Sequence, residues 1–413
     1  VYEKTAAHPR FRFFGNVELG RDVSRDELAG HYHAIVYATG SPADRPLGIP
    51  GEDLEGSHPA TDFVGWYNGH PDFPDHYFDL SAGRAVVIGN GNVALDVARM
   101  LTLSHEELAV TDIADHALEA LDASSVREIV VVGRRGPAQA AFTNPELREL
   151  GELADADVIV DPDELERALA VEDPNMDATS TQNVAILRDY AGRTPAGGTA
   201  AGGGGRKRVV LRFLLSPVEL RGDKSCVRTV VLARNALRTG QDGRLRAEPT
   251  GETETIEAGL VMRAIGYKGK PLPGVPFDER SATIPNEGGR VYGPDGPLPG
   301  EYTVGWIKRG PSGVIGTNKK DAQETVDALL EDLAAGAHLE PADPDPQAIE
   351  ELLRTRVEAL VTYEAWSEID RHEQALGEPH GRPRVKLTRI EHLLRVAAGE
   401  APTEEPLDTL GLR

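Results

Sequence analysis

The chain has 413 residues, which is enough for two domains with separate hydrophobic cores. Its formal net charge of −23 disfavours binding to nucleic acid or to anionic membrane surfaces, and no apolar run is long enough to span a bilayer. The single cysteine, Cys226, excludes an internal disulfide framework and argues against a thiolate zinc site, so we expect a reducing, cytoplasmic compartment and no metal.

The first half of the sequence predicts strands that alternate with helices. Strand patterns occupy four segments, at residues 11–20, 33–38, 84–88 and 128–132. The last two are continuous apolar runs, which are typical of strands buried on both faces of a parallel sheet. A helix is expected over about residues 92–103, and the Pro-, Gly- and Asp-rich residues 41–83 are expected to form linker and loop.

The second half begins with a Gly-rich segment at residues 196–205, which predicts a flexible loop. No helix follows it directly, so it is not a phosphate-binding loop. Further strands are expected at three segments, residues 209–215, 228–237 and 260–265, of which the first two suggest an antiparallel excursion. Helices are expected from Gly313 onward and near residues 347–375 and 387–398. The alternation predicts an α/β chain with parallel sheets.

A dinucleotide-binding pattern comes directly after the strand at residues 84–88. In the sequence IGNGNVALDVAR, Gly89, Gly91 and Ala94 match G-x-G-x-x-A. Gly89 permits a tight turn, Gly91 lets a pyrophosphate approach the backbone, and Ala94 keeps the helix close to the strand. The alternative is an ordinary strand-to-helix turn, which the strand before and the helix after make less favoured.

Two arginines, Arg134 and Arg135, end the next strand, where an NAD site would carry an acidic residue. Guanidinium groups bind a phosphate with two parallel hydrogen bonds, so the pair predicts NADP rather than NAD. Residues 104–127 must then be an insertion after the helix, because the spacing exceeds the usual ~20 residues. A solvated turn is the alternative interpretation.

A looser motif occurs twice, as VYATG at residues 36–40 and as MRAIG at residues 262–266. Paired strand ends of this kind are typical of flavoproteins with two dinucleotide sites, although each one alone fits a plain strand end equally well. This interpretation makes residues 44–258 an inserted NADP-binding domain. Residues 1–43 and 259–413 are then the two parts of a FAD-binding domain.

From Glu3 to about Leu394 the sequence resembles bacterial ferredoxin–NADP reductases of the adrenodoxin-reductase type. The matching segments include PRFRFFGNVELG, DRPLGIPGEDLEG, AVVIGNGNVALDVAR, VVGRRGPAQAAFTNPELREL, YTVGWIKRGPSGVIGTNKKDA and GEPHGRPRVKL. The resemblance implies two Rossmann-like dinucleotide-binding domains, NADPH as electron donor, FAD as prosthetic group and an iron–sulfur ferredoxin as acceptor. We expect a monomer.

The family starts with its own G-x-G-x-x-G, which is absent here. We therefore expect a truncated N-terminus and a FAD domain that lacks its first strand.

The resemblance also implies which residues bind the cofactors. The NADP site would comprise Arg45, Asn90, Gly91, Asn92, Val93, Arg134, Arg135, Glu146 and Gly313. The FAD site would comprise Glu18 through its backbone, Trp306, Gly313, Val314 and Ile315. Glu149 matches an acidic residue near the flavin and is the candidate catalytic residue, although hydride transfer to a flavin needs no protein acid or base. A solvated helix charge is the alternative for Glu149.

Two other functions stay open on the sequence. One is the NADPH-oxidising flavin subunit of a larger complex, like the small subunit of glutamate synthase. The other is a non-catalytic NADP-binding module, which is favoured if the chain truly begins at Val1.

An acidic ferredoxin could dock on basic residues, or these could be ordinary solvated charges. The candidates are Arg206–Arg208, Lys308-Arg309, Lys319-Lys320 and Arg382–Lys386.

Overall fold

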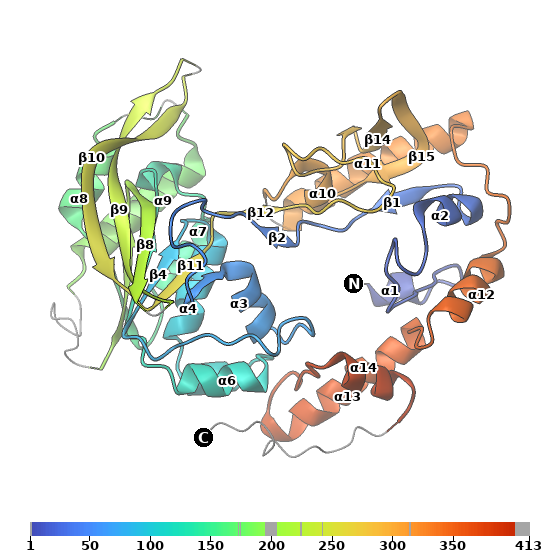
Figure 1. Cartoon of the computed structure of the whole chain (residues 1–413), viewed down its shortest axis with the longest axis horizontal. Coiled ribbons are helices and arrows are strands. Elements are labelled where there is room, and N and C mark those ends of the chain that lie inside the picture. Colours follow the sequence, from blue (N-terminus) through green and yellow to red (C-terminus); the bar gives the residue numbers. More distant parts are fainter. Residues whose placement is uncertain are drawn as a thin grey trace. The chain divides into compact units, whose positions relative to one another are not determined.

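The computed structural model describes residues 2–400, except for residues 172, 174, 195–204, 224, 242 and 314 (Figure 1). The chain forms two compact units. The terminal unit holds the described residues up to Ala43, Tyr267–Gly377 and the described residues from Leu387. The inserted unit holds Asp44–Gly266 and Glu378–Lys386. Short strands lie where the chain passes from one unit to the other, β2 (Ala43–Asp44) and β12 (Tyr267–Lys268).

The chain passes from the inserted unit back to the terminal unit later in the sequence than predicted. Strand β11 (Leu260–Arg263) pairs in parallel with β4 (Arg84–Ile88), so it belongs to the sheet of the inserted unit. The expected boundary at residues 258/259 is therefore wrong, and the inserted unit extends to Gly266. The assignment of residues 259–413 to one domain is also wrong for Glu378–Lys386, which includes η2 (Glu378–His380).

The inserted unit is built on a six-stranded parallel sheet. Its strand order is β3 (Ser57–Pro59), β11, β4, β5 (Glu128–Val132), β7 (Lys207–Arg212) and β6 (Ala156–Val160). Side chains alternate between the two faces of a strand. Ala85 and Val87 of β4 pack into a core with the helices, whereas Val86 and Ile88 pack on the opposite face. Burial on both faces explains why β4 and β5 are continuous apolar runs.

Helices cover one face of this sheet and a second sheet covers the other (Figure 1). The helices are α3 (Ala60–Tyr67), α4 (Asn92–Thr102), α5 (His105–Leu108), α6 (Asp115–Asp122), α7 (Asn144–Leu150), α8 (Pro162–Leu169) and α9 (Ala178–Gly192). The short helix η1 (Pro137–Gln139) follows β5. The predicted insertion over residues 104–127 therefore contains α5 and α6.

The second sheet is antiparallel, with the order β10 (Leu245–Glu257), β9 (Cys226–Thr239) and β8 (Leu215–Asp223). Leu220, Val230 and Leu232 pack against Val86 and Ile88 of β4. The sequence predicted an antiparallel excursion here but assigned residues 209–215 to it. That assignment is wrong, because β7 pairs in parallel with β5 and β6.

The terminal unit has a four-stranded mixed sheet. Its order is β1 (Ile35–Tyr37), β15 (Gly296–Thr303), β14 (Arg290–Gly293) and β13 (Asn286–Glu287), with β1 parallel to β15. The helices of this unit are α1 (Glu3–Ala6), α2 (Arg25–His31), α10 (Trp306–Arg309), α11 (Ile315–Ala335), α12 (Pro346–Arg356), α13 (Tyr363–Gly377) and α14 (Ile390–Ala397).

The strand expected over residues 11–20 is not formed. Asn16 has a φ of +59°, which interrupts an extended run, and the segment makes only isolated bridges, Gly15 with Val361 and Leu19 with Val23. Phe14, Val17 and Leu19 instead pack against Ile349 and Leu353 of α12. The Gly-rich loop predicted over residues 196–205 lies outside the described residues, apart from Gly205.

The described ranges contain neither a membrane-spanning helix nor a cluster of metal-ligating side chains. No helix there combines the length and apolarity needed to cross a bilayer. No cluster of three or more His, Cys, Asp or Glu side chains there is placed to hold a metal ion.

The sheet of the inserted unit contains a histidine with a perturbed pKa. Burial, with smaller contributions from Arg263 and His76, lowers the pKa of His58 from 6.5 to about 4. The folded protein therefore binds this proton more weakly than the unfolded chain does. The contribution of His58 to the free energy of unfolding is therefore fully present above pH 6.5, and it is lost as the pH falls from 6.5 toward 4.

We expect the ring of His58 to stay neutral between about pH 8 and pH 5 in an NMR titration. The His58→Gln variant serves to assign the signal. A ring signal of His58 that titrates near the ordinary value of about 6.5 would contradict this expectation.

Candidate functional site

The turn after β4 has the geometry of a dinucleotide-binding turn. Gly89 has a φ of +133°, and a Cβ atom there would lie 2.2 Å from the carbonyl oxygen of Ala264. Only glycine fits this position. The chain leaves β4 toward β5 on one side, while β11 pairs on the other side. Gly89 therefore lies at the point where the strand order reverses, which is where open parallel sheets bind ligands.

Helix α4 begins at this turn without a side-chain cap. Its N-cap residue, Gly91, has an extended backbone, and a Cβ atom there would meet only the Cβ of Ala141, at 3.9 Å. The approach to the first turn of α4 is thus open, as binding of a pyrophosphate requires. We call Gly89–Asn92 the fingerprint turn.

The predicted residues of the fingerprint turn are brought together in the structure. The side-chain oxygen of Asn92 accepts a hydrogen bond from the Thr143 N–H at 2.8 Å. The Asn90 carbonyl accepts one from the Ala141 N–H at 2.9 Å. The Nδ2 of Asn90 is buried and has no hydrogen-bond partner, and Val93 packs against the helix-covered core. An unpaired buried donor at this turn fits a site that binds a polar ligand.

Arg134 and Arg135, which we call the arginine pair, follow β5 directly. Burial lowers the pKa of Arg135, and the positive charge of Arg134 lowers it further, against the opposing effect of Asp173. The backbone of the pair is fixed, because the Asn235 Nδ2 donates to the Arg134 carbonyl at 2.9 Å and the Leu214 N–H donates to the Arg135 carbonyl at 3.1 Å. Two like charges held in this way favour an anion such as a phosphate.

The two predicted glutamates lie on α7, which packs against α4. Arg99 donates to Glu149 at 2.9 Å and to Asp96 at 3.3 Å. Burial raises the pKa of Asp96, and Glu146 and Glu149 raise it further while Arg99 opposes them. Oε2 of Glu146 is buried without a hydrogen-bond partner, whereas the Glu149 side chain is 54% exposed. A catalytic role of Glu149 stays a prediction, and its exposure and ion pair equally fit a solvated helix charge.

The sequence did not single out Asp96. The signal was available, because Asp96 and Arg99 are spaced i, i+3 on the helix that opens with the fingerprint turn.

The predicted flavin residues lie in the terminal unit. Trp306 begins α10, and its indole Nε1 is buried without a hydrogen-bond partner. Gly313 has a φ of +80°, which favours glycine, and Ile315 is the first residue of α11. Val314 lies outside the described residues. Gly313 was also assigned to NADP, whereas the other predicted NADP residues all belong to the inserted unit.

Glu18 was expected to meet the flavin adenine through its backbone. In the structure its N–H donates to a carboxylate oxygen of Asp22 at 2.8 Å, and its carbonyl accepts from the Asp22 N–H at 2.9 Å. Both backbone groups of Glu18 therefore already have partners within the chain. The role of Glu18 stays a prediction.

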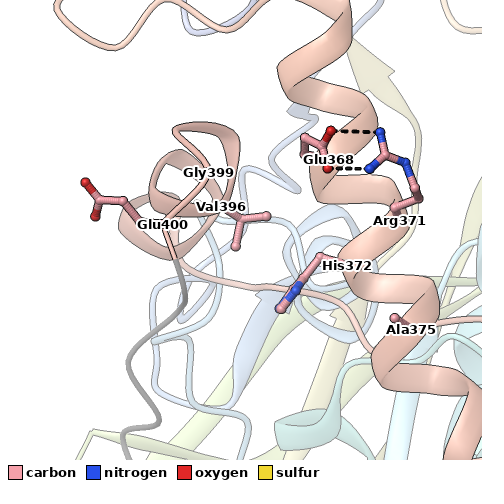
Figure 2. Close-up of a pocket in the computed structure, with 7 residues that line it drawn as sticks. All are labelled: Glu368, Arg371, His372, Ala375, Val396, Gly399 and Glu400. Atoms are coloured by element: carbon pink, nitrogen blue, oxygen red, sulfur yellow. Dashed lines mark hydrogen bonds and ion pairs between the residues drawn. The ribbon is translucent and has the colours of Figure 1, made fainter.

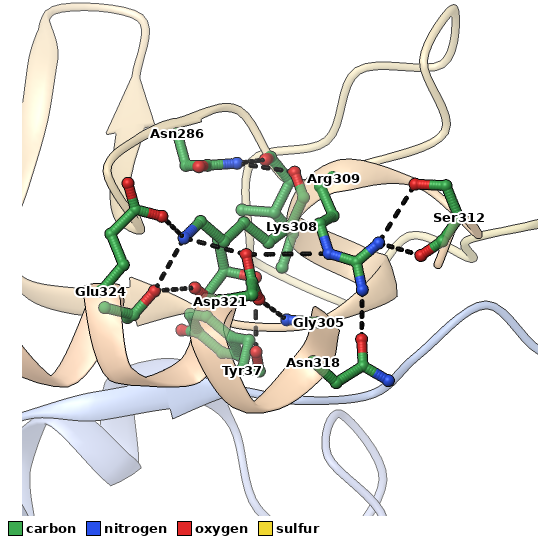
Figure 3. Close-up of polar contacts among 12 residues, drawn as sticks. Tyr37, Asn286, Gly305, Lys308, Arg309, Ser312, Asn318, Asp321 and Glu324 are labelled. Carbon is green, nitrogen blue, oxygen red and sulfur yellow. Dashed lines mark hydrogen bonds and ion pairs between the residues drawn. The ribbon is translucent and has the colours of Figure 1, made fainter. Parts of the chain in front are cut away.

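A polar network around the buried side chains of Lys308 and Asp321 joins α10 to α11 (Figure 3). Asp321 of α11 accepts from the Gly305 N–H at 2.6 Å and lies 3.1 Å from the Lys308 Nζ. The Lys308 Nζ also donates to Glu324 at 2.7 Å and to the Thr325 hydroxyl at 3.1 Å. Arg309 donates to the Ser312 hydroxyl at 3.1 Å. These contacts tie α10 and residues 305–312 to α11.

A pocket of about 680 Å³ lies between α13 and α14 of the terminal unit (Figure 2). Its lining residues are Glu368, Arg371, His372, Ala375, Val396, Gly399 and Glu400. Nε2 of His372 is buried without a hydrogen-bond partner, and Arg371 is paired with Glu368. None of the residues that the sequence assigned to a cofactor lines this pocket.

Most of the basic clusters considered for docking have structural partners. Arg206 pairs with Asp157, and the Lys207 Nζ donates to the Leu101 carbonyl. Arg382 donates to the Thr111 and Ile113 carbonyls. Lys319 and Lys320 are exposed on α11, so they are the cluster most accessible to a partner.

The comparisons with known proteins agree with this geometry. A family model described as pyridine nucleotide-disulphide oxidoreductase matches residues 5–131. The NADPH-ferredoxin reductase FprA of Mycobacterium leprae (strain TN) is 53% identical over 402 residues, which cover 96% of this chain and 85% of the relative. The chain belongs to the NADPH-ferredoxin reductase family.

Other members of the NADPH-ferredoxin reductase family extend the comparison. The mitochondrial NADPH:adrenodoxin oxidoreductase of Salvelinus fontinalis is 41% identical over 402 residues, covering 96% of this chain and 80% of the relative. The solved structure of Mycobacterium tuberculosis FprA in complex with NADPH is 52% identical, with a TM-score of 0.89 and coverage of 96% and 86% of the two chains. The α/β fold with two Rossmann-like dinucleotide-binding units, predicted from the sequence, is thereby confirmed.

Proposed function

We propose that the protein passes electrons from NADPH, through FAD, to a ferredoxin-type iron–sulfur protein. The observation that supports this most directly is the fingerprint turn beside the arginine pair, at the reversal point of a parallel sheet. NADPH-ferredoxin reductases are also the relatives that match nearly the whole chain.

In this proposal the inserted unit binds NADPH. The first turn of α4 receives the pyrophosphate, since its N–H groups lack a side-chain cap. The arginine pair binds the 2′-phosphate, which is the one group that distinguishes NADPH from NADH. Arg45 adds a positive charge, and the unpaired atoms of Asn90 and Glu146 are available for the polar groups of the nucleotide.

The terminal unit would hold FAD. The buried, unpaired indole N–H of Trp306 and the left-handed Gly313 before α11 fit a polar, closely approaching ligand. FAD held by these residues would supply the conversion of a hydride from NADPH into two single electrons. One NADPH therefore reduces two one-electron acceptors and releases NADP⁺ and one proton. The residues of the chain bind and orient the two cofactors.

The partner in this proposal is an acidic ferredoxin. Lys319 and Lys320 are the exposed basic residues that we propose it meets. The monomeric state and the cytoplasmic location expected from the sequence stay predictions.

Steady-state reduction of a [2Fe–2S] ferredoxin by the purified flavoprotein tests this function. We expect two ferredoxins to be reduced per NADPH, and kcat/KM to be at least about a hundredfold higher with NADPH than with NADH. The proposal fails if NADPH reduces the flavin but no electrons reach ferredoxin, or if NADH serves equally well.

A further inference from the structure

The carboxyl end of β11 carries a buried arginine that no nucleotide-binding role accounts for. Arg263 is 11% exposed. Its guanidinium donates to the Ser57 hydroxyl at 3.0 Å and to Asp44 at 3.3 Å, and its Nε lies 3.3 Å from Oε1 of Glu52. One guanidinium thus faces two carboxylates, so its removal would leave two negative charges close together without a counter-charge.

Glu52 uses its carboxylate to shape the loop that carries Arg45. One oxygen accepts from the Leu47 N–H at 2.5 Å, and the other accepts from the Gly48 N–H at 2.7 Å. The Glu52 side chain is also 11% exposed. We call residues 44–52 the Arg45 loop. Arg263 therefore holds it at both ends, through Asp44 at the start and through Glu52 at the finish.

The backbone next to Arg263 fixes two predicted NADP-binding elements. The Gly266 carbonyl accepts from the Arg45 N–H at 3.1 Å. The Ala264 N–H donates to the Ile88 carbonyl at 2.7 Å, and the Ala264 carbonyl lies against Gly89. The segment from Arg263 to Gly266 is therefore in contact with both the fingerprint turn and the Arg45 loop.

We propose that Arg263 is a positioning residue for NADP binding. With Glu52 it orients the Arg45 loop beside the fingerprint turn, so that both elements can contact one dinucleotide. This inference rests on the proposed function, because it takes Arg45 and the fingerprint turn as NADP contacts. Its chemical basis is preorganisation: a loop that is already fixed loses less entropy when the anion binds.

The test compares Arg263→Met with a matched control, Arg84→Met. Arg84 forms a similar partly buried ion pair with Glu128, but at the amino end of β4, away from the fingerprint turn. We expect Arg263→Met to raise both the KM for NADPH and the Kd for NADP⁺, from a fluorescence titration, by about tenfold. We expect the change in kcat to be smaller, the preference for NADPH over NADH to persist, and Arg263→Lys to restore part of the affinity. Arg84→Met should change neither KM nor Kd by more than about twofold.

One further variant keeps the test decisive if Arg263→Met folds poorly, and a double variant checks that Arg263 and Arg45 act through the same loop. Glu52→Gln retains the size of the side chain but loses one acceptor, so it should weaken NADP⁺ binding in the same direction. In an Arg45→Ala background, Arg263→Met should add little further loss, because both changes act through the same loop.

The inference is overturned if Arg263→Met and Glu52→Gln bind NADP⁺ like the Arg84→Met control. It is also overturned if Arg263→Met has its full effect in the Arg45→Ala background. In either case a normal loss of affinity on replacing the arginine pair would leave the proposed function intact. A variant of the arginine pair that still prefers NADPH would instead contradict the proposed function itself.

Discussion

Replacing both Arg134 and Arg135 by Ala is expected to raise the KM for NADPH by about a hundredfold or more and to change the KM for NADH only slightly. The two guanidiniums lie at the end of β5, and burial together with mutual repulsion lowers the pKa of Arg135. A bound 2′-phosphate would relieve that repulsion, and NADH has no such group to lose.

Steady-state kinetics with both nucleotides provide this measurement. Arg188→Ala is a suitable control, because Arg188 forms an exposed ion pair with Glu166 in the same unit. Its loss should affect neither nucleotide. Equal increases of KM for NADPH and NADH in the double variant would rule out the 2′-phosphate as the ligand of the arginine pair.

Lys308→Met is expected to destabilise the protein by about 3–5 kcal/mol, because it leaves the carboxylate of Asp321 buried without its main counter-charge. The two side chains are 7% and 6% exposed. Asp321 keeps its hydrogen bond from the Gly305 N–H and a longer ion pair with Arg309, whose Nε lies 3.8 Å from the carboxylate, but neither replaces the closer contact with Lys308 (Figure 3). Chemical denaturation, followed by fluorescence, would measure the change.

The matched control is Arg371→Met. Arg371 and Glu368 also form an ion pair, but the arginine side chain is 66% exposed, so its loss should lower the free energy of unfolding far less than the loss of Lys308 does. The double variant Lys308→Met with Asp321→Leu should regain part of the lost stability, because no unpaired charge stays buried. If Lys308→Met costs no more than Arg371→Met, the network of Figure 3 does not hold the Trp306 segment in place.

The elements that were predicted correctly are those whose pattern is local. Strands β4 and β5 have the bounds that the sequence predicted, since burial on both faces leaves an unbroken apolar run. Helix α4 was predicted from the glycine pattern that precedes it. The strand expected over residues 11–20 is not formed, because Asn16 adopts a left-handed conformation and Phe14, Val17 and Leu19 pack against helix α12.

Features that depend on distant contacts were missed. Residues 41–83 were expected to be linker and loop, yet they contain β3 and α3, because β3 is completed by pairing with β11 about two hundred positions later. The boundary at residue 258 failed for the same reason, since β11 joins the sheet of the inserted unit.

The sequence likewise predicted the local parts of the candidate site and missed the parts that depend on distant contacts. The fingerprint turn and the arginine pair are short motifs, so the sequence identified them. The contact between Asp44 and Arg263 joins residues that are 219 positions apart, and no local pattern indicates it. Glu52 and Arg263 therefore became visible only in the folded chain.

The most direct test of NADP binding at the fingerprint turn is an experimental structure of the flavoprotein with NADP⁺. We predict the pyrophosphate at the start of α4, over Gly91 and Asn92, and the 2′-phosphate within hydrogen-bond distance of both Arg134 and Arg135. A complex in which the 2′-phosphate lies away from the arginine pair, or the pyrophosphate lies away from α4, would contradict this assignment.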